Sequence, residues 1–319
     1  MIFKFRPLLK PTLWGGDRIA AMKRLGEVPG IGESWEVSGI EGSVSVVAAG
    51  DYAGRTLTQL VHHMGERLMG RHVAARYGDE FPLLVKVIDA HADLSVQVHP
   101  DDETARRHGH ARGKTEMWYI MPSDVDAKLY CGFNHDMTVE EYRRRVHDGT
   151  LCEALRQYAV REGDVFYLPS GRVHAICAGC LLIEVQQASD VTFRMYDYGR
   201  KDREGRERPL HIDEAAEVTL WADNGDERIR YTPEVGHGVE LVRCTAFCVV
   251  RYDIEDEAIP IREAAADSFV ILIGIAGEGT VEAAGRKTPL CCNETLLVAA
   301  ECTGLRVEGR MSLLAVYVP

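Results

Sequence analysis

Short apolar stretches separated by turn residues dominate the hydrophobic pattern of this chain. Turn residues recur about every eight to twelve positions, and the stretches between them are rich in β-branched and aromatic residues. The clearest stretches are VSVVA, PLLVKVI, LSVQVH, EMWYIM, AKLYC, VFYLP, LLIEVQQ and VTFRMY. This spacing is typical of a β-sandwich or barrel, so we predict a mainly β fold in which helices are small insertions.

Helical periodicity is limited to a few segments. Thr56 and Gln59 form a capping-box pattern ahead of apolar residues at helical spacing, which predicts a helix over 56–69. Similar starts occur further along the chain, and the acidic DDET after Pro100 opens a helical turn. The other helical segments that we predict are 138–147 and 151–158, within insertions near 56–75 and 137–158.

The chain is predicted to contain two β domains. A polar, charged stretch at 199–209 follows the densest β region, and the β pattern resumes after about residue 238 without any histidine. We therefore expect any metal site to lie in the first half of the chain. We predict a catalytic domain over 1–235 and a smaller β-sandwich without a metal site over 236–319.

Charge and apolar run length argue against several classes of function. The 37 Lys and Arg residues against 49 Asp and Glu give a formal net charge of -12, whose field repels nucleic acid. No apolar run approaches the ~18 residues of a spanning helix and no signal peptide is recognisable, so we expect a cytoplasmic protein without a membrane partner. The nine cysteines, Cys177 and Cys180 of a single CxxC included, are expected to be reduced packing residues.

Three stretches carry the side chains that point to chemistry. In LSVQVH the two-residue period of a strand sends Gln97 and His99 to the same face. In GKTEMW the same period places Lys114 and Glu116 on a common face. The third stretch, GDVFYLPSGRVH, is predicted to be a hairpin whose turn leads at once into a strand carrying His174.

The third stretch resembles the second metal motif of the cupin superfamily, although the asparagine that often follows its histidine is absent. QVHPDD with GKTEMW resembles the first cupin motif, with Gln97 in place of its leading histidine. Gln97, His99, Glu116 and His174 then form a set of two imidazoles, one carboxylate and one amide, which suits zinc and leaves iron(II), manganese or cobalt open. We therefore expect a cupin jelly roll with a metal site, followed by a smaller cupin-like sandwich.

The likeness extends to one family, the type I mannose-6-phosphate isomerases (phosphomannose isomerases), especially their short bacterial form. It covers most of residues 1–200, whereas from about 240 onward it is only architectural. The similar segments, in order and spacing, are PTLWGGDRI (11–19), GESWEVSG (32–39), FPLLVKVIDAHADLSVQVHPDD (81–102), GKTEMWYI (113–120), REGDVFYLPSGRVHAI (161–176) and LLIEVQQASDVTFRMYDYGR (181–200).

The resemblance implies a ligand set and a reaction. In that family zinc is held by the residues that match Gln97, His99, Glu116 and His174, and an active-site arginine matches Arg194. The reaction implied is the interconversion of D-mannose 6-phosphate and D-fructose 6-phosphate. A small sugar phosphate is therefore the expected partner.

That isomerisation takes a proton from C2 of the open-chain aldose, forms a cis-enediol and returns a proton at C1. A divalent metal stabilises the enediolate charge without a redox step. Lys114 beside a metal cation would have its ammonium form disfavoured, so it is our first choice for moving the proton. Glu36 and Glu184 are the alternatives, and Glu36 is also a candidate substrate contact.

The substrate phosphate requires fixed cations. Arg194, Arg172 and Lys86 lie on strand-like segments from which they could face the pocket. Arg172 shares the strand parity of His174, so we expect it to point into the same cavity. Arg194 could instead lie over the developing enediolate, and Lys86 could be a packing residue whose amine reaches solvent. Trp14 either stacks on the sugar or packs between sheets.

Two other functions fit parts of the pattern. Two histidines and one carboxylate also form the facial triad of an iron(II) dioxygenase, but Gln97 would occupy a position that oxygen needs. A non-catalytic cupin that binds a sugar phosphate would keep the metal as a structural element, yet has little reason to bury Lys114 beside it. The oligomeric state is left open.

Overall fold

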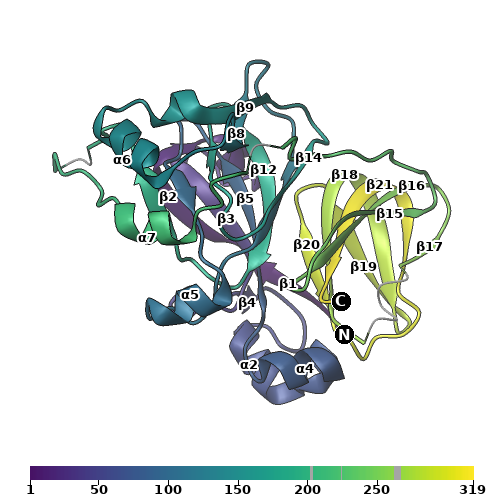
Figure 1. The fold of residues 1–319 in the computed structure, drawn as a ribbon. Coiled ribbons are helices and arrows are strands. Elements are labelled where there is room, and N and C mark those ends of the chain that lie inside the picture. Colours follow the sequence, from purple (N-terminus) through teal and green to yellow (C-terminus); the bar gives the residue numbers. More distant parts are fainter. Residues whose placement is uncertain (202–203, 224, 262–266) are drawn as a thin grey trace. The chain divides into compact units, whose positions relative to one another are not determined.

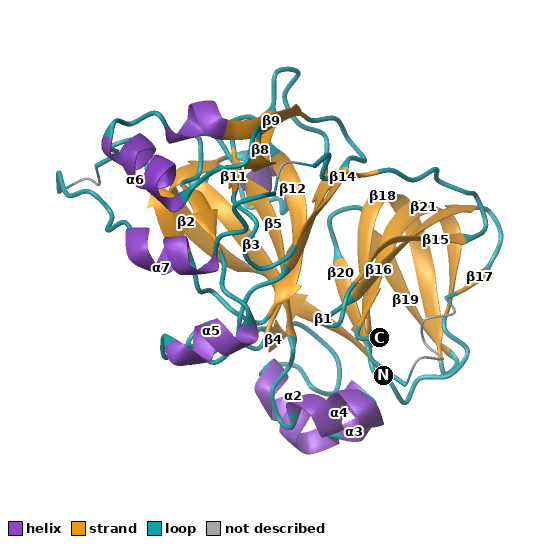
Figure 2. Cartoon of the chain, in the orientation of Figure 1, coloured by secondary structure: helices purple, strands orange, loops and turns teal. Residues whose placement is uncertain are grey.

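The computed structural model describes residues 1–201, 204–223, 225–261 and 267–319, which divide into two compact units. The middle unit consists of Leu9–Ser34 and Lys86–Ile229. The terminal unit consists of Met1–Leu8, Trp35–Val85 and Arg230–Pro319. Strands dominate both units, as predicted (Figure 2). The sequence predicts two contiguous domains, whereas each unit combines separate stretches, and the boundary at residue 235 stays a prediction.

The strands of the middle unit belong to two sheets (Figure 1). Their strand orders are β14-β10-β7-β12-β5-β3-β2 and β13-β6-β11-β8-β9. The seven-stranded sheet contains β2 (Leu8–Gly16), β3 (Ile31–Ser38), β5 (Leu83–Asp89), β7 (Glu116–Ile120), β10 (Val165–Leu168), β12 (Leu181–Gln187) and β14 (Arg228–Ile229). The five-stranded sheet contains β6 (Val96–Val98), β8 (Lys128–Phe133), β9 (Leu155–Ala159), β11 (His174–Ile176) and β13 (Phe193–Tyr196).

The core of the middle unit lies between these two sheets. Trp118 and Phe166 of the seven-stranded sheet pack in one buried cluster with Leu129 of the five-stranded sheet. The opposite face of the five-stranded sheet packs against α6 (Val139–His147) and α7 (Ile212–Val218). This is the sandwich that the strand pattern predicts, and side chains on its inner faces are removed from water.

One sheet of nine strands builds the terminal unit. Its order is β15-β16-β21-β18-β20-β1-β4, with β17 added to β21 and β19 to β18. The strands are β1 (Ile2–Arg6), β4 (Val46–Val47), β15 (Gly238–Arg243), β16 (Cys248–Glu255), β17 (Ile259–Pro260), β18 (Val270–Ala283), β19 (Arg286–Cys291), β20 (Thr295–Val298) and β21 (Arg306–Tyr317). Strand β1 pairs with β20, so the first strand of the chain completes the sheet built by its last segment.

The predicted capping box at the first long helix is present. Gln59 N donates to the Thr56 side chain, and Thr56 N donates to the Gln59 side chain. The predicted helix over 56–69 is interrupted, however, because Gly65 adopts a φ of 52° between α2 (Leu57–Met64) and α3 (Glu66–Met69). A third helix, α4 (Arg71–Tyr77), follows in the same unit.

Other local predictions are partly wrong. The helix predicted over 151–158 is a 3₁₀ turn, Leu151–Ala154, followed by strand β9, because pairing with β8 outweighs the local helical signal.

The middle unit also contains α1 (Arg18–Met22) and α5 (Asp102–Arg107). None of the helices in the described ranges is long and apolar enough to span a membrane.

The predicted hairpin ahead of His174 is also wrong. Strands β10 and β11 belong to different sheets, so the Pro-Ser-Gly turn carries the chain from one side of the sandwich to the other. Gly171 has a φ of 87° there, and a Cβ on it would lie 2.6 Å from the carbonyl oxygen of Val218. Gly171 N donates to the carbonyl oxygen of His99, which ties this crossing to the end of β6.

Candidate metal centre

Strand register brings several predicted site residues into one row of the five-stranded sheet. Arg194 pairs with Gln97, Gln97 pairs with His174, and His174 pairs with Cys131. Directly opposed residues of antiparallel strands project from the same face. Because Cys131 belongs to the core between the sheets, this row faces the interior of the sandwich.

The seven-stranded sheet presents two rows of its own. Glu116 is opposite Gln186 on β12, and Trp118 is opposite Glu184. Trp118 lies in the core between the sheets, and the two-residue period therefore turns Glu116, Glu184 and Gln186 inward as well. The two sheets thus place their polar side chains in a common interior.

Three of the predicted ligands converge there. Ligand atoms of His99, Glu116 and His174 all lie within 4.8 Å of one another, and each residue is at most 2% exposed. His174 Nε2 is 3.3 Å from Glu116 Oε1, and His99 Nε2 is 3.7 Å from Glu116 Oε2. Gln97 reaches the same cluster, with its side-chain nitrogen 3.3 Å from His174 Nε2.

Protonation of the cluster fits a cation. Burial lowers the pKa of His174 to about 3, and burial together with the Lys114 charge holds the pKa of His99 well below its usual range. Both imidazoles are therefore neutral near pH 7, which is the form that binds metal. Burial and the charge of Glu184 raise the pKa of Glu116 to about 7, so a nearby cation would stabilise its carboxylate.

The hydrogen bonds of the two histidines leave an Nε2 atom of each available to bind a metal. His174 Nδ1 is 2.9 Å from the carbonyl oxygen of Arg172. Because a carbonyl only accepts, Nδ1 carries the proton and Nε2 presents its lone pair to the cluster. Among the described residues, no hydrogen-bond partner is found for His99 Nε2. The donor set therefore fits a divalent metal, with the amide of Gln97 turned so that its oxygen is the ligand.

A chain of buried charges lies beside the cluster. Lys114 Nζ is 2.8 Å from Glu116 Oε2 and 3.9 Å from Glu184 Oε1. Lys86 Nζ is 3.0 Å from Glu184 Oε1. Burial disfavours the charged forms of Lys86 and Glu184. At Glu184 the positive charges of Lys114 and Lys86 outweigh burial and lower its pKa to about 2. In the same way Glu184 and Glu33 raise the pKa of Lys86.

The turn before β7 fixes Lys114. Lys114 N donates to the carbonyl oxygen of Pro100, and Gly113 N donates to Asp102 Oδ1 at the start of α5. A Cβ on Gly113 would lie 2.4 Å from the carbonyl carbon of Asp101, so only glycine allows this close approach. The helical turn predicted at DDET thus anchors the lysine beside the segment after β6 that carries His99.

Arg172 makes different contacts from those predicted. Its guanidinium binds both carboxylate oxygens of Asp223, at 2.8 and 3.0 Å, and lies 2.5 Å from Glu227. It also donates to the carbonyl oxygen of Tyr167. Strand parity with His174 does not apply because β11 begins only at His174. A phosphate contact of Arg172 stays a prediction, and these partners already satisfy much of its guanidinium.

Arg194 stands in the inward-facing row next to Gln97. Its guanidinium donates to the carbonyl oxygen of Pro209 at 2.9 Å, and its backbone N donates to His211. Burial and the nearby Arg208 lower its pKa, whereas the carboxylate of Asp197 acts in the opposite direction. A bound anion could form charge-assisted hydrogen bonds with this guanidinium.

The remaining predicted contacts lie elsewhere. Trp14 is buried in the core with Ile88 and Leu94, which is the packing alternative for this side chain. Glu36 is buried on β3, in the stretch that belongs to the terminal unit. The substrate contacts of both residues stay predictions.

Sequence reasoning did not single out Trp118 or Gln186, although both stand in the inward rows. The available signal was parity, because Trp118 follows Glu116 by two positions and Gln186 follows Glu184 by two. On a strand such pairs share a face. Bulky aromatic and neutral polar residues on β strands are common, so this signal alone is weak.

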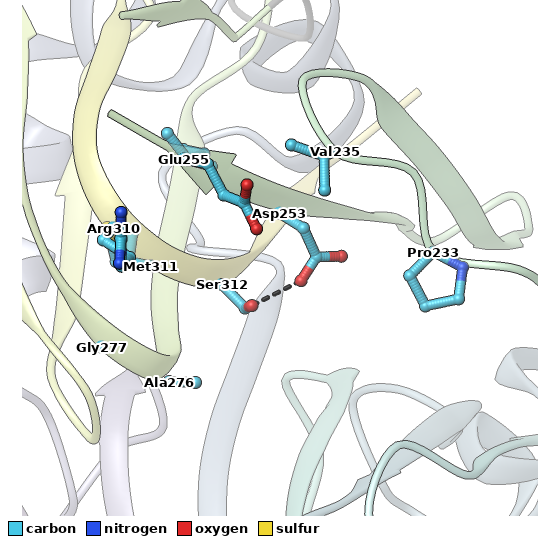
Figure 3. A pocket seen from close by; sticks show the side chains of 10 residues that line it. Pro233, Val235, Asp253, Glu255, Ala276, Gly277, Arg310, Met311 and Ser312 are labelled. Carbon is cyan, nitrogen blue, oxygen red and sulfur yellow. Dashed lines mark hydrogen bonds between the residues drawn. The ribbon is translucent and has the colours of Figure 1, made fainter. Parts of the chain in front are cut away.

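A concave region lies on the nine-stranded sheet of the terminal unit, lined by none of the cluster residues (Figure 3). It encloses about 420 Å³, and no predicted site residue lines it. Two of its charged groups are already paired: Asp253 with Arg251 and Ser312, and Arg310 with Asp256. Nothing in this lining resembles a catalytic set.

A β-sandwich that encloses a buried His–Glu–His cluster defines a cupin-type protein with a candidate metal centre. Comparison with known proteins identifies the family within that class. Residues 2–159 match the family model "Phosphomannose isomerase type I, catalytic domain". The chain is 35% identical to mannose-6-phosphate isomerase ManA of Bacillus subtilis over 96% of this chain and 95% of that protein. It is 32% identical to the mannose-6-phosphate isomerase of Streptococcus mutans over 95% and 94%.

The fold agrees with these sequence matches. The crystal structure of mannose 6-phosphate isomerase from Bacillus subtilis superposes with a TM-score of 0.86, at 30% identity and with 99% of each chain covered. The chain therefore belongs to the type I phosphomannose isomerase family.

Proposed function

We propose that this protein is a zinc-dependent isomerase that interconverts D-mannose 6-phosphate and D-fructose 6-phosphate through a cis-enediol. The observation that carries the proposal is the buried cluster of His99, Glu116 and His174 with Lys114 Nζ 2.8 Å from Glu116. A metal site and an amine side by side can supply the two functions of aldose–ketose isomerisation, stabilisation of the enediolate charge and transfer of the proton. The relatives named as mannose-6-phosphate isomerases support the same substrate. We propose the cytoplasm as its location, from the sequence alone.

The metal would be held by Gln97, His99, Glu116 and His174. When bound, it supplies a Lewis acid that polarises the sugar oxygens and stabilises negative charge without a redox step. Two imidazoles, a carboxylate and an amide favour zinc over calcium or magnesium, which prefer all-oxygen sites. Metal analysis of the purified protein would identify the ion.

Lys114 is our candidate for moving the proton between C2 and C1. Its amine lies between two carboxylates, Glu116 and Glu184, which orient it within a site that excludes water. Lys86 is held by Glu184 from the other side, and we propose it as a substrate contact rather than a free surface amine. Glu184 is fixed as an anion by these two lysines, which makes it the weaker candidate for accepting a proton.

Arg194 is our candidate for binding the substrate phosphate or the enediolate. Arg194→Ala should lower kcat/KM by about a hundredfold, because charge-assisted hydrogen bonds to an arginine contribute about 1.5–3 kcal/mol each. Metal content should stay near that of the unchanged protein, since no proposed ligand is removed. Arg143→Ala, on the exposed side of α6, is the control and should change neither. Unaltered kinetics of the Arg194 variant would remove this residue from the site.

A coupled assay tests the proposed function. Purified protein is given mannose 6-phosphate, and fructose 6-phosphate is measured before chelation, after chelation and after zinc is restored. We expect turnover that chelation abolishes and zinc restores. Binding of mannose 6-phosphate without any turnover would instead indicate the non-catalytic sugar-phosphate-binding cupin. Oxygen uptake by the iron-loaded protein would indicate the dioxygenase.

A further inference from the structure

Trp118 makes one polar contact inside the sandwich. The ring is fully buried on β7, directly opposite Glu184 on β12. Its indole Nε1–H donates to Glu184 Oε2 at 2.9 Å. The ring also meets the imidazole of His174 edge to face, with centroids 5.2 Å apart and planes at 86°. Trp118 therefore touches both a proposed metal ligand and the carboxylate beside the two lysines.

The two oxygens of Glu184 have separate partners. Oε2 accepts from Trp118, whereas Oε1 lies 3.0 Å from Lys86 Nζ and 3.9 Å from Lys114 Nζ. Rotation of the carboxylate would break the indole bond and displace Oε1 from both amines together. A buried carboxylate oxygen without a donor is costly, so the indole N–H holds the group in the orientation in which Oε1 binds Lys86 and attracts the charge of Lys114.

We propose that Trp118 is a positioning residue, whose indole N–H orients Glu184 and, through it, the amine of Lys114 for proton transfer and the amine of Lys86 for substrate contact. The inference rests on the proposed isomerase function. It goes beyond that function because it assigns a kinetic role to a hydrophobic residue that has no proposed contact with substrate or metal.

The rival explanation is that Trp118 only fills the core. Phe166 stands opposite Trp118 on β10 in the same buried cluster, so packing around this ring is close. Packing depends on the shape of the ring, whereas positioning depends on a single N–H group. The two roles therefore separate when the N–H is removed and the shape is kept.

The test replaces Trp118 by 3-benzothienylalanine, in which sulfur takes the place of the indole N–H. With mannose 6-phosphate as substrate, we expect kcat to fall about tenfold, as for loss of one hydrogen bond to a buried charge, while KM stays within about threefold. Zinc content should stay near that of the unchanged protein, and the thermal midpoint should fall only by the few degrees expected for one lost buried hydrogen bond. The same replacement at Trp221, which stacks on Phe133, is the control and should leave kcat unchanged.

Two variants with natural amino acids repeat the test in case the unnatural residue hinders folding. Trp118→Phe should lower kcat, whereas Phe166→Leu, a loss of volume in the same core, should lower only stability. Full kcat in the benzothienyl variant or in Trp118→Phe, with the unchanged protein active, would overturn the role of Trp118 alone. An unchanged protein that binds zinc but does not turn over mannose 6-phosphate would overturn the proposed function.

Discussion

Replacing His174 by Ala should remove the bound metal and the isomerase activity together. The substitution deletes one of two imidazole ligands and leaves Glu116 buried with less compensation, so metal affinity falls steeply. We expect kcat to drop by about a thousandfold or more, because Lewis-acid stabilisation of an enediolate is worth several kcal/mol and each 1.36 kcal/mol is tenfold in rate. Metal stoichiometry by elemental analysis and the coupled assay measure both effects.

The control for this variant is another histidine of the same unit. His91 is exposed on the loop after β5, where its backbone N donates to the carbonyl oxygen of Trp14. His91→Ala should keep the metal and full activity. Thermal unfolding of both variants identifies any general loss of structure. A metal-free His174→Ala protein with unimpaired turnover would contradict the proposed site.

Strand periodicity explains why this much of the site could be predicted. Gln97 with His99, and Lys114 with Glu116, are separated by two positions, and a two-residue period places such pairs on one face regardless of the rest of the fold. His99 and Lys114 lie just outside β6 and β7, yet both reach the cluster, so the period still placed them correctly. Arg172 likewise lies just before β11, but its guanidinium is held instead by the carboxylate of Asp223, which is distant in sequence. No local pattern reveals such a partner.

Topology was the harder part to predict. The stretch from β10 to β11 has the length and turn residues of a hairpin, yet the two strands separate into different sheets. Local turn chemistry allows either connection, and the choice is made by burial of both sheets against a common core. The same limit applies to β1, whose pairing with β20 joins the two ends of the chain without any local signal.

Replacing Lys114 by Met should keep the metal but stop proton transfer. Met retains most of the aliphatic length and loses the amine, so the proposed ligands are all still present. General acid–base catalysis by one positioned group contributes about a hundred- to ten-thousandfold, and kcat should fall in that range with a smaller change in KM. With mannose 6-phosphate deuterated at C2, the isotope effect on kcat should rise, because C–H cleavage becomes fully rate-limiting.

Lys128→Met is the matched control, since Lys128 lies on β8 of the same unit and binds the exposed side chain of Gln157. It should leave kcat and the isotope effect unchanged. If Lys114→Met kept kcat within about threefold of the unchanged protein, the proton would have to be carried by another group. Glu184 would be the next candidate. Glu184 lies between Lys86 and Lys114, so the loss of one cation makes its carboxylate easier to protonate. The double variant Lys114→Met, Glu184→Gln would therefore separate direct proton transfer by Glu184 from its role in holding the lysines.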